Sequence, residues 1–161
     1  MCKEELLLID EYYTLKYSTT SSGHAFRSFT ESPSDVYNLR NKTNYMRTTS
    51  WNKIPITTRW ITNNLCDESH LGMVCLNKLS AGGSVKWHSH GSYKMKIVHF
   101  SLITNDLDLS EVRKNDEVFA MNYPERKGYI FNSIMEHRST NFSEHDRIHL
   151  VVECNYIQSM I

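Results

Sequence analysis

The sequence predicts a mostly β fold, an antiparallel sandwich or barrel to which α-helices from the N-terminal half are added. The first observation is a series of short apolar runs, alternating with polar residues after position 70, which is typical of strands at regular intervals. The second is that the first half is more polar and carries two helix-like stretches. The third is the length of 161 residues, which suits one domain. We therefore expect a single domain, residues 1–161, in which residues 1–69 support a barrel core at residues 70–154.

The N-terminal half is expected to contribute short strands and helices. Residues 13–26 read as strand pieces broken by a polar turn. Residues 32–46 are typical of a helix, with a serine cap and Pro33 near the start. Residues 57–68 place three large apolar side chains at helical spacing and predict a second helix.

The second half is expected to form the barrel itself. Alternating apolar residues and the turn SAGG between the first two runs predict a succession of strands: residues 70–79, 84–90, 93–103, one or two within 111–128, 128–132 and 146–154. A small barrel receives alternate side chains in its interior and can hold one small ligand there.

Composition excludes several classes of function. Lys and Arg number 18, and so do Asp and Glu, so the chain lacks an overall basic field and nucleic acid is not expected as a partner. The four cysteines form no C-x-x-C pair, which argues against a structural zinc motif or a disulfide framework. The N-terminal MCKEELLLID is neither a signal peptide nor a membrane span. We expect a cytoplasmic protein with no membrane partner.

The stretch WHSHGSY, residues 87–93, places two histidines one residue apart. In an extended strand, residues i and i+2 point to the same face, so His88 and His90 are expected to project side by side while Trp87 turns away. His137 lies further along the chain and is a candidate third nitrogen ligand. Imidazole suits iron among other metals, so the three histidines predict a metal site inside the barrel.

The strand DRIHLVVE has two different faces. Alternation puts Ile148, Leu150 and Val152 on an apolar, core-like face, and Arg147 and His149 on the other. If that second face lines a cavity, the permanently charged Arg147 needs an anionic partner there. A ligand that carries a carboxylate would supply one, and the constellation as a whole describes a non-haem iron site beside a carboxylate pocket.

The stretches LNKLSAGGSVKWHSHG, KIVHFSLI and KGYIFNSIMEHRSTNFSEHDRIHLVVE carry a recognisable spacing: His-x-(Asp or substitute), about fifty residues, His, ten residues, Arg. On these motifs the chain resembles the aspartyl/asparaginyl β-hydroxylase family over about residues 70–154. The resemblance implies a double-stranded β-helix, the cupin or jelly-roll barrel. It also implies chemistry that uses Fe(II), 2-oxoglutarate and molecular oxygen.

Carried over to this chain, the resemblance makes His88 and His137 iron ligands and Arg147 the partner of the distal carboxylate of 2-oxoglutarate. It assigns His99 to the other end of the cosubstrate and Asn77 to a position near the arginine.

The chain departs from the family pattern in two places. The family often has Arg-x-His where this chain has Ile97-Val98-His99, and the third metal position holds His90, which we expect to ligate iron with the other two histidines. His149 and Trp87 are candidates for supporting roles around the site.

The leading hypothesis is a hydroxylase that acts on an amino acid or on an Asp/Asn-like residue, with a small molecule or a peptide as substrate. Three-histidine iron sites also occur in cupin dioxygenases that do not use 2-oxoglutarate, which is the first alternative. A non-catalytic barrel that binds a metal or a ligand is the second.

Overall fold

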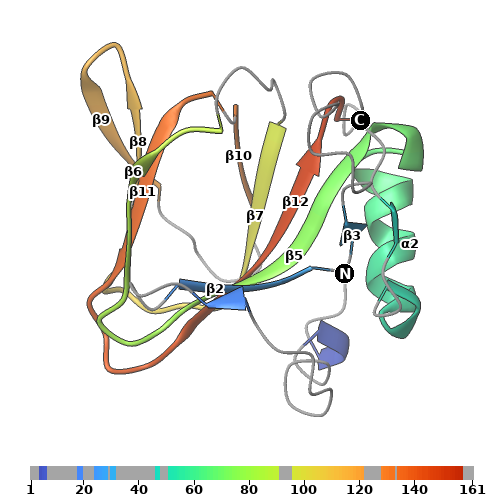
Figure 1. The fold of residues 1–161 in the computed structure, drawn as a ribbon, viewed down its shortest axis with the longest axis horizontal. Helices are drawn as coiled ribbons and strands as arrows, with labels where there is room; N and C mark the ends of the chain where they lie inside the picture. The colour runs from blue at the N-terminus through green and yellow to red at the C-terminus, as the bar shows by residue number, and fades with distance from the viewer. Residues whose placement is uncertain are drawn as a thin grey trace.

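Two antiparallel β-sheets face each other and splay apart towards one end of the molecule (Figure 1). The structure is a computed structural model that describes residues 4–6, 18–19, 24–28, 30–31, 46–47, 51–90, 96–121, 128–132 and 134–157. The larger sheet has the strand order β1 (Ser18–Thr19), β2 (His24–Ser28), β5 (Leu71–Leu79), β12 (Arg147–Cys154), β7 (Lys96–Ile103) and β10 (Gly128–Asn132). The smaller has the order β6 (Ser84–His88), β11 (Glu136–Asn141), β8 (Asp108–Lys114) and β9 (Glu117–Met121).

The remaining elements lie in the N-terminal half. A two-stranded sheet pairs β3 (Thr30–Glu31) with β4 (Met46–Arg47). The helical elements are residues 4–6, the 3-10 turns η2 (Trp51–Lys53) and η3 (Glu68–His70), and α2 (Pro55–Asn64). Within the described residues, no helix combines the length and the apolar character that crossing a membrane requires.

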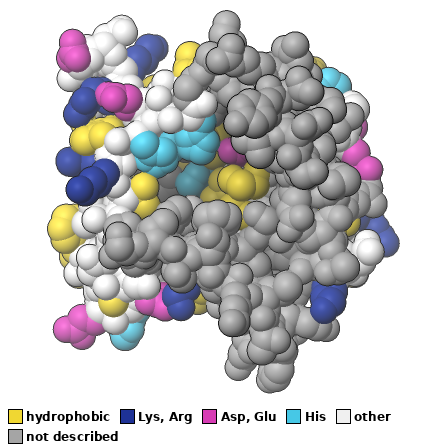
Figure 2. All heavy atoms as spheres, viewed as in Figure 1, with side chains coloured by type: hydrophobic (Ala, Val, Ile, Leu, Met, Phe, Trp, Pro, Cys, Tyr) yellow, Lys and Arg dark blue, Asp and Glu magenta, His cyan; other side chains and the backbone are white. Residues whose placement is uncertain are grey.

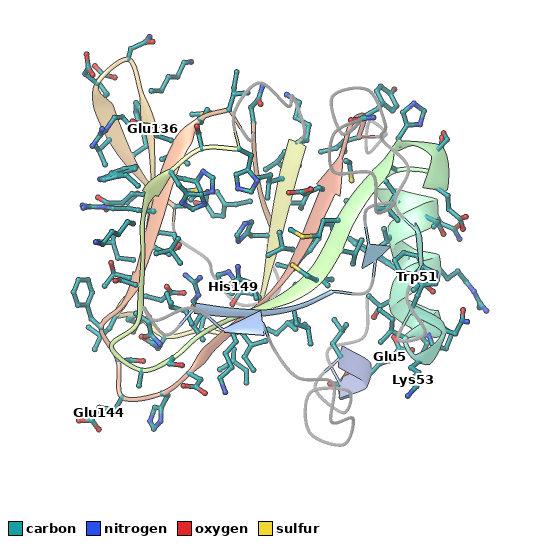
Figure 3. All side chains as sticks on the ribbon, in the orientation of Figure 1. Glu5, Trp51, Lys53, Glu136, Glu144 and His149 are labelled. Atoms are coloured by element: carbon teal, nitrogen blue, oxygen red, sulfur yellow. The ribbon has the colours of Figure 1, made fainter. Side chains whose placement is uncertain are left out.

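Helix α2 covers the outer face of the six-stranded sheet (Figure 1). It begins at Pro55, a residue preorganised for the first helical position. The carboxylate of Glu5 accepts hydrogen bonds from the backbone N–H groups of Ile56 and Thr57, at 3.0 and 2.8 Å, and so caps the helix. Beneath the helix, the main core brings together Ile61 and other apolar residues of this segment, among them Trp51 (Figure 3), with the outward faces of β5, β7 and β12.

The prediction of two faces on β12 is confirmed. Its apolar face packs under α2, and this face includes Leu150 at 0% exposure. The alternate residues, beginning with Arg147, point between the two sheets, where Val151 joins a second and smaller core cluster. The strand is therefore buried on both faces along its whole length, which fits its position between two neighbours in the sheet.

The strands predicted for the second half are confirmed, with differences at their ends. The region 111–128 holds the end of β8 and the whole of β9. Strand β6 ends at His88 instead of residue 90, and residues 93–95 of the strand predicted at 93–103 lie outside the described residues. The predicted helix at 57–68 is present but spans Pro55–Asn64, because the chain turns into η3 before residue 70. The helix predicted at 32–46 lies outside the described residues except for Met46, which belongs to strand β4.

Two cysteines that are distant in the sequence meet in the core. The thiols of Cys66 and Cys154 are both fully buried, with their sulfur atoms 2.9 Å apart, and both are free. The pKa of Cys154 is raised by its contact with Cys66 and by burial. The thiol of Cys154 is therefore protonated at neutral pH, and both buried side chains act as small apolar packing groups.

Candidate metal centre

Three histidines converge between the sheets at the smaller sheet. His88 and His137 are direct partners across the β6–β11 ladder, with ring centroids 4.1 Å apart. The ring of His90, two residues beyond the end of β6, lies 5.4 Å from that of His88 and 5.2 Å from that of His137. One ligand nitrogen from each of the three residues lies within 4.8 Å of the others. Histidine side chains gather at the rim of a hollow in the surface (Figure 2).

A β-bulge positions His88. The ladder pairs His137 with His88 but Ser139 with Val85, so two residues of β6, Lys86 and Trp87, lie opposite one residue of β11, Arg138. Strict alternation would put Val85 and His88 on opposite faces, yet both line the same cavity. The extra residue re-aims the strand and turns Trp87 to the outside. Bulges leave no clear signal in a hydrophobic pattern, so the sequence did not predict this one.

Backbone carbonyls orient two of the rings. The Nδ1 atom of His88 lies 2.9 Å from the carbonyl oxygen of Lys86, and Nδ1 of His137 lies 2.9 Å from that of Met135. A neutral imidazole that donates from Nδ1 keeps the lone pair on Nε2 for a metal, which is the arrangement usual for metal-binding histidines. Burial, together with the neighbouring His88 and His90, lowers the pKa of His137 to about 4 despite its bond to Met135. His137 is therefore neutral and ready to ligate at pH 7.

His90 faces a carboxylate instead of a carbonyl. Its Nδ1 lies 3.6 Å from Oε1 of Glu153 on β12, slightly too far for a hydrogen bond. Burial raises the pKa of Glu153 to about 7, and burial followed by the charge of His88 lowers the pKa of His90. No local pattern in the sequence distinguishes Glu153, although it lies on the same face of β12 as Arg147.

A single cavity of about 230 Å³ joins these groups. Its size is below the roughly 300–1,000 Å³ of pockets for drug-sized ligands and suits a small ligand. Six residues predicted from the sequence line it: His88, His90, His137, Arg147, His99 and Asn77. Their roles in binding remain predictions. The rest of the wall is largely apolar and includes Met73, Ile97 and Val151.

Arg147 lies at this cavity but already has a protein partner. It is 1% exposed, and its Nη1 donates to Oδ1 of Asp108 at 2.9 Å and to the hydroxyl of Ser110 at 3.1 Å. Asp108 belongs to the opposite sheet, so the ion pair ties the two sheets together. The expectation that this buried cation requires a ligand carboxylate is therefore corrected, because Asp108 supplies the anion. The buried Nε atom of Arg147 has no hydrogen-bond partner among the described residues.

His149 supports the arginine rather than the three histidines. It is fully buried between the sheets (Figure 3), and its Nε2 lies 3.5 Å from Oδ2 of Asp108. The hydroxyl of Thr104 donates to the same oxygen. Burial alone would raise the pKa of Asp108, but His149 and Arg147 outweigh it and hold that pKa below its usual value. Burial and the charge of Arg147 lower the pKa of His149 to about 4.

Trp87 lies on the outer surface of the smaller sheet. The guanidinium groups of Arg113 and Arg138 lie 4.3 and 4.8 Å from its ring centroid, which are cation–π distances. Trp87 does not line the cavity. Its contacts with the two arginines pack the outer surface of the smaller sheet.

We expect the metal-free protein to lose stability as the pH falls from about 6.5 to about 4. His137 and His149 have pKa values of about 4 in the folded chain but about 6.5 when unfolded. The unfolded state therefore binds more protons in this range, and stability that is complete above pH 6.5 is lost on acidification. Glu153 acts in the opposite direction, because its raised pKa makes the folded state the better proton acceptor below about pH 7.

Denaturant unfolding at pH 7 and pH 5, with a chelator present, measures this dependence. His149→Gln should flatten it by removing one of the buried histidines whose pKa is lowered, and Glu153→Gln should steepen it by removing the opposing group. An unfolding free energy that stays constant or rises between pH 7 and pH 5 would contradict the prediction.

Comparisons with known proteins identify the family and the fold. A sequence model of the family described as Aspartyl/Asparaginyl beta-hydroxylase matches residues 10–156. Among curated proteins, no sequence matches the chain.

Similar solved structures include an oxidoreductase of the 2OG-Fe(II) oxygenase family from Burkholderia pseudomallei. Its TM-score is 0.67 at 13% identity, covering 95% of this chain and 80% of that one. An oxalate oxidase has a TM-score of 0.51 at 9% identity, covering 89% of this chain and 56% of that one. For the oxalate decarboxylase of Lactobacillus farciminis the TM-score is 0.51 at 10% identity, with coverages of 88% and 31%. At such identities the likeness is one of fold, and it confirms the mostly β, cupin-like double-stranded β-helix.

Proposed function

This chain belongs to the aspartyl/asparaginyl β-hydroxylase family, and on that premise we propose that it is an Fe(II)- and 2-oxoglutarate-dependent hydroxylase. The observation that carries the proposal is that the three histidines and Arg147 line one cavity. Its substrate would be an amino acid or an Asp/Asn-like residue of a peptide, with molecular oxygen as the second substrate.

The residues present fit the metal. Three imidazole nitrogens within 4.8 Å of one another are a donor set that iron accepts. His88 and His137 have their Nδ1 atoms engaged by carbonyls, which leaves Nε2 of each for the ion. In this proposal His88, His90 and His137 hold Fe(II).

The other end of the cavity fits a carboxylate. Arg147 has a buried Nε without a described partner, and the side-chain oxygen of Asn77 is buried in the same way. Asp108 and Ser110 hold Nη1 and so fix the plane of the guanidinium. A fixed guanidinium is the group best suited to bind a carboxylate through two hydrogen bonds. Arg147 would hold the distal carboxylate of 2-oxoglutarate, with His99 and Asn77 beside the cosubstrate.

The chemistry that bound Fe(II) would supply is hydroxylation of a C–H bond, coupled to oxidative decarboxylation of 2-oxoglutarate to succinate. The chain contributes position and a protected environment. The neutral His137 is ready to bind a cation without first releasing a proton at pH 7. The apolar side chains of Met73, Ile97 and Val151 line the space between the histidines and Arg147 and would limit the access of water there.

The direct test is succinate formation. The purified protein is incubated with Fe(II), 2-oxoglutarate and oxygen, together with a panel of free amino acids and short peptides. Substrate-dependent succinate that disappears on chelation and returns with Fe(II) is the expected result. Succinate that does not depend on added iron would contradict the proposal.

The Arg147–Asp108 ion pair favours a second candidate function. Because Asp108 already neutralises Arg147, the fold does not require a diacid in the cavity. The donor set of three histidines is also that of cupin dioxygenases that bind their substrate directly to iron. Anaerobic spectroscopy separates the two: visible absorption on addition of 2-oxoglutarate to the Fe(II) protein supports the first function. Absorption that appears only with another substrate supports the second, and failure to bind iron would support a non-catalytic barrel.

A further inference from the structure

We infer that Glu153 is a positioning residue for the metal centre, acting on the ion through His90. This inference rests on the proposed function. In the usual iron site a ligand supplies a negative charge directly to the ion, whereas here Glu153 would supply that charge from the far side of His90. That usual site has two histidines and one carboxylate. In this chain the carboxylate does not contact the ion, because His90 lies between the two.

The placement of Glu153 is the first argument. It is 5% exposed, it lines the same cavity as the three histidines, and its Oε1 faces Nδ1 of His90 at 3.6 Å. The same ring atom of His88 and of His137 faces a backbone carbonyl. An oxygen atom thus faces Nδ1 of each of the three rings. Of these three oxygens, only the one that faces His90 belongs to an ionisable side chain.

The cost of burial is the second argument. The cavity wall around Glu153 includes Met73, Ile97 and Val151, and a carboxylate buried among such groups is costly unless a positive charge compensates it. The backbone of Met73 provides a hydrogen bond but no charge. A cation bound by His90 would provide the positive charge that stabilises the buried carboxylate of Glu153.

Charge balance is the third argument. Fe(II) with doubly negative 2-oxoglutarate and three neutral histidines has a net charge of zero, whereas one aspartate ligand would make it minus one. Ionised Glu153 restores the value of minus one without occupying a coordination position. At 3.6 Å from Nδ1 of His90, the carboxylate would act on the ion through its charge rather than through a hydrogen bond. Glu153 therefore compensates for the histidine at the third metal position.

The test is metal affinity, measured by anaerobic titration of the full chain with Fe(II) alone and, separately, with Co(II). Glu153→Gln keeps the shape of the side chain and is expected to weaken binding about 10–100-fold, as for other partners of ligating histidines. Glu136→Gln is the matched control, since it removes an equal charge next to His137 from an exposed side chain paired with Arg113. It should leave the affinity unchanged.

Two further variants show whether Glu153 acts through His90. In a His90→Ala background, Glu153→Gln should have no additional effect on affinity. The pair His90→Asp and Glu153→Gln returns the carboxylate to the metal itself and should recover the loss. Native affinity in Glu153→Gln, or a full loss that persists in the His90→Ala background, would overturn the inference. A native chain that binds neither ion would instead refute the proposed function.

Discussion

Replacement of Arg147 by methionine is expected to lower the free energy of unfolding by about 3–5 kcal/mol, because it leaves the carboxylate of Asp108 buried without its cation. The two side chains are 2% and 1% exposed, with Nη1 and Oδ1 2.9 Å apart. Thr104 and His149 would still contact the other oxygen of Asp108. Neither supplies the permanent positive charge of a guanidinium. Urea unfolding at pH 7.5 measures the loss.

The same ion pair supplies the matched controls. Asp108→Asn keeps an oxygen for the hydroxyl of Thr104 but leaves the guanidinium buried without its anion, so a similar loss is expected. The double variant with Arg147→Met and Asp108→Asn removes both charges. It should be more stable than the sum of the two single losses implies, because interacting partners are not additive. Strictly additive losses would show that the two charges do not act as a pair.

Cosubstrate binding separates the structural role of Arg147 from its proposed chemical role. Arg147→Met and the double variant should both lose the visible absorption that 2-oxoglutarate produces with the Fe(II) protein. Asp108→Asn should keep it, because the guanidinium is still present and now lacks a competing anion. If the double variant is stable and still binds 2-oxoglutarate as tightly as the native chain, then Arg147 does not hold the cosubstrate.

Most strands could be predicted because their apolar residues repeat with the period of the pleat. Strand β12 is the clearest case: Leu150 and its alternate neighbours pack under helix α2, and the residues between them face the cavity. Strand β11, EHRSTN, was not predicted as a separate strand because it has no such repeat. Its outer face carries Glu136 and Arg138, which pair with charges on β8, and its inner face presents the polar side chains of His137 and Ser139 to the cavity. A strand with two polar faces has no alternation of apolar and polar residues from which it could be predicted.

The site could be predicted in part for a related reason. Spacing along a strand determines which side chains share a face, and this was enough to bring His88, His90 and His137 together as candidates. Contacts between the two sheets depend on how the sheets pack, and no local pattern encodes them. Asp108 reaches Arg147 from the opposite sheet, 39 positions away in the sequence. Because Asp108 already pairs with Arg147, the buried arginine is not by itself evidence that the ligand is an acid.

Replacing His137 by alanine is expected to have the largest effect on metal binding of any single change. It is the most buried of the three histidines, at 8% exposure. Its ring is also the closest to both others, 4.1 Å from His88 and 5.2 Å from His90 between centroids. Loss of a direct ligand should exceed the roughly 10–100-fold that outer partners contribute, so we expect Fe(II) affinity to fall by more than about 100-fold. Anaerobic titration measures it, with His145→Ala, an exposed histidine in a turn, as the control.

The third position should behave differently from His137, because His90 lies beyond the end of β6 and its side chain is 34% exposed. His90→Asp recreates the set of two histidines and one carboxylate and is expected to keep iron and succinate production. His90→Gly removes the ligand and, with it, the path from Glu153 to the ion, so its affinity should fall further than that of Glu153→Gln. If His90→Gly and His90→Asp bind iron equally well, the third imidazole is not a ligand. In that case the charge of Glu153 would need another cation, and the amino group of a substrate in the same cavity would be the first to test.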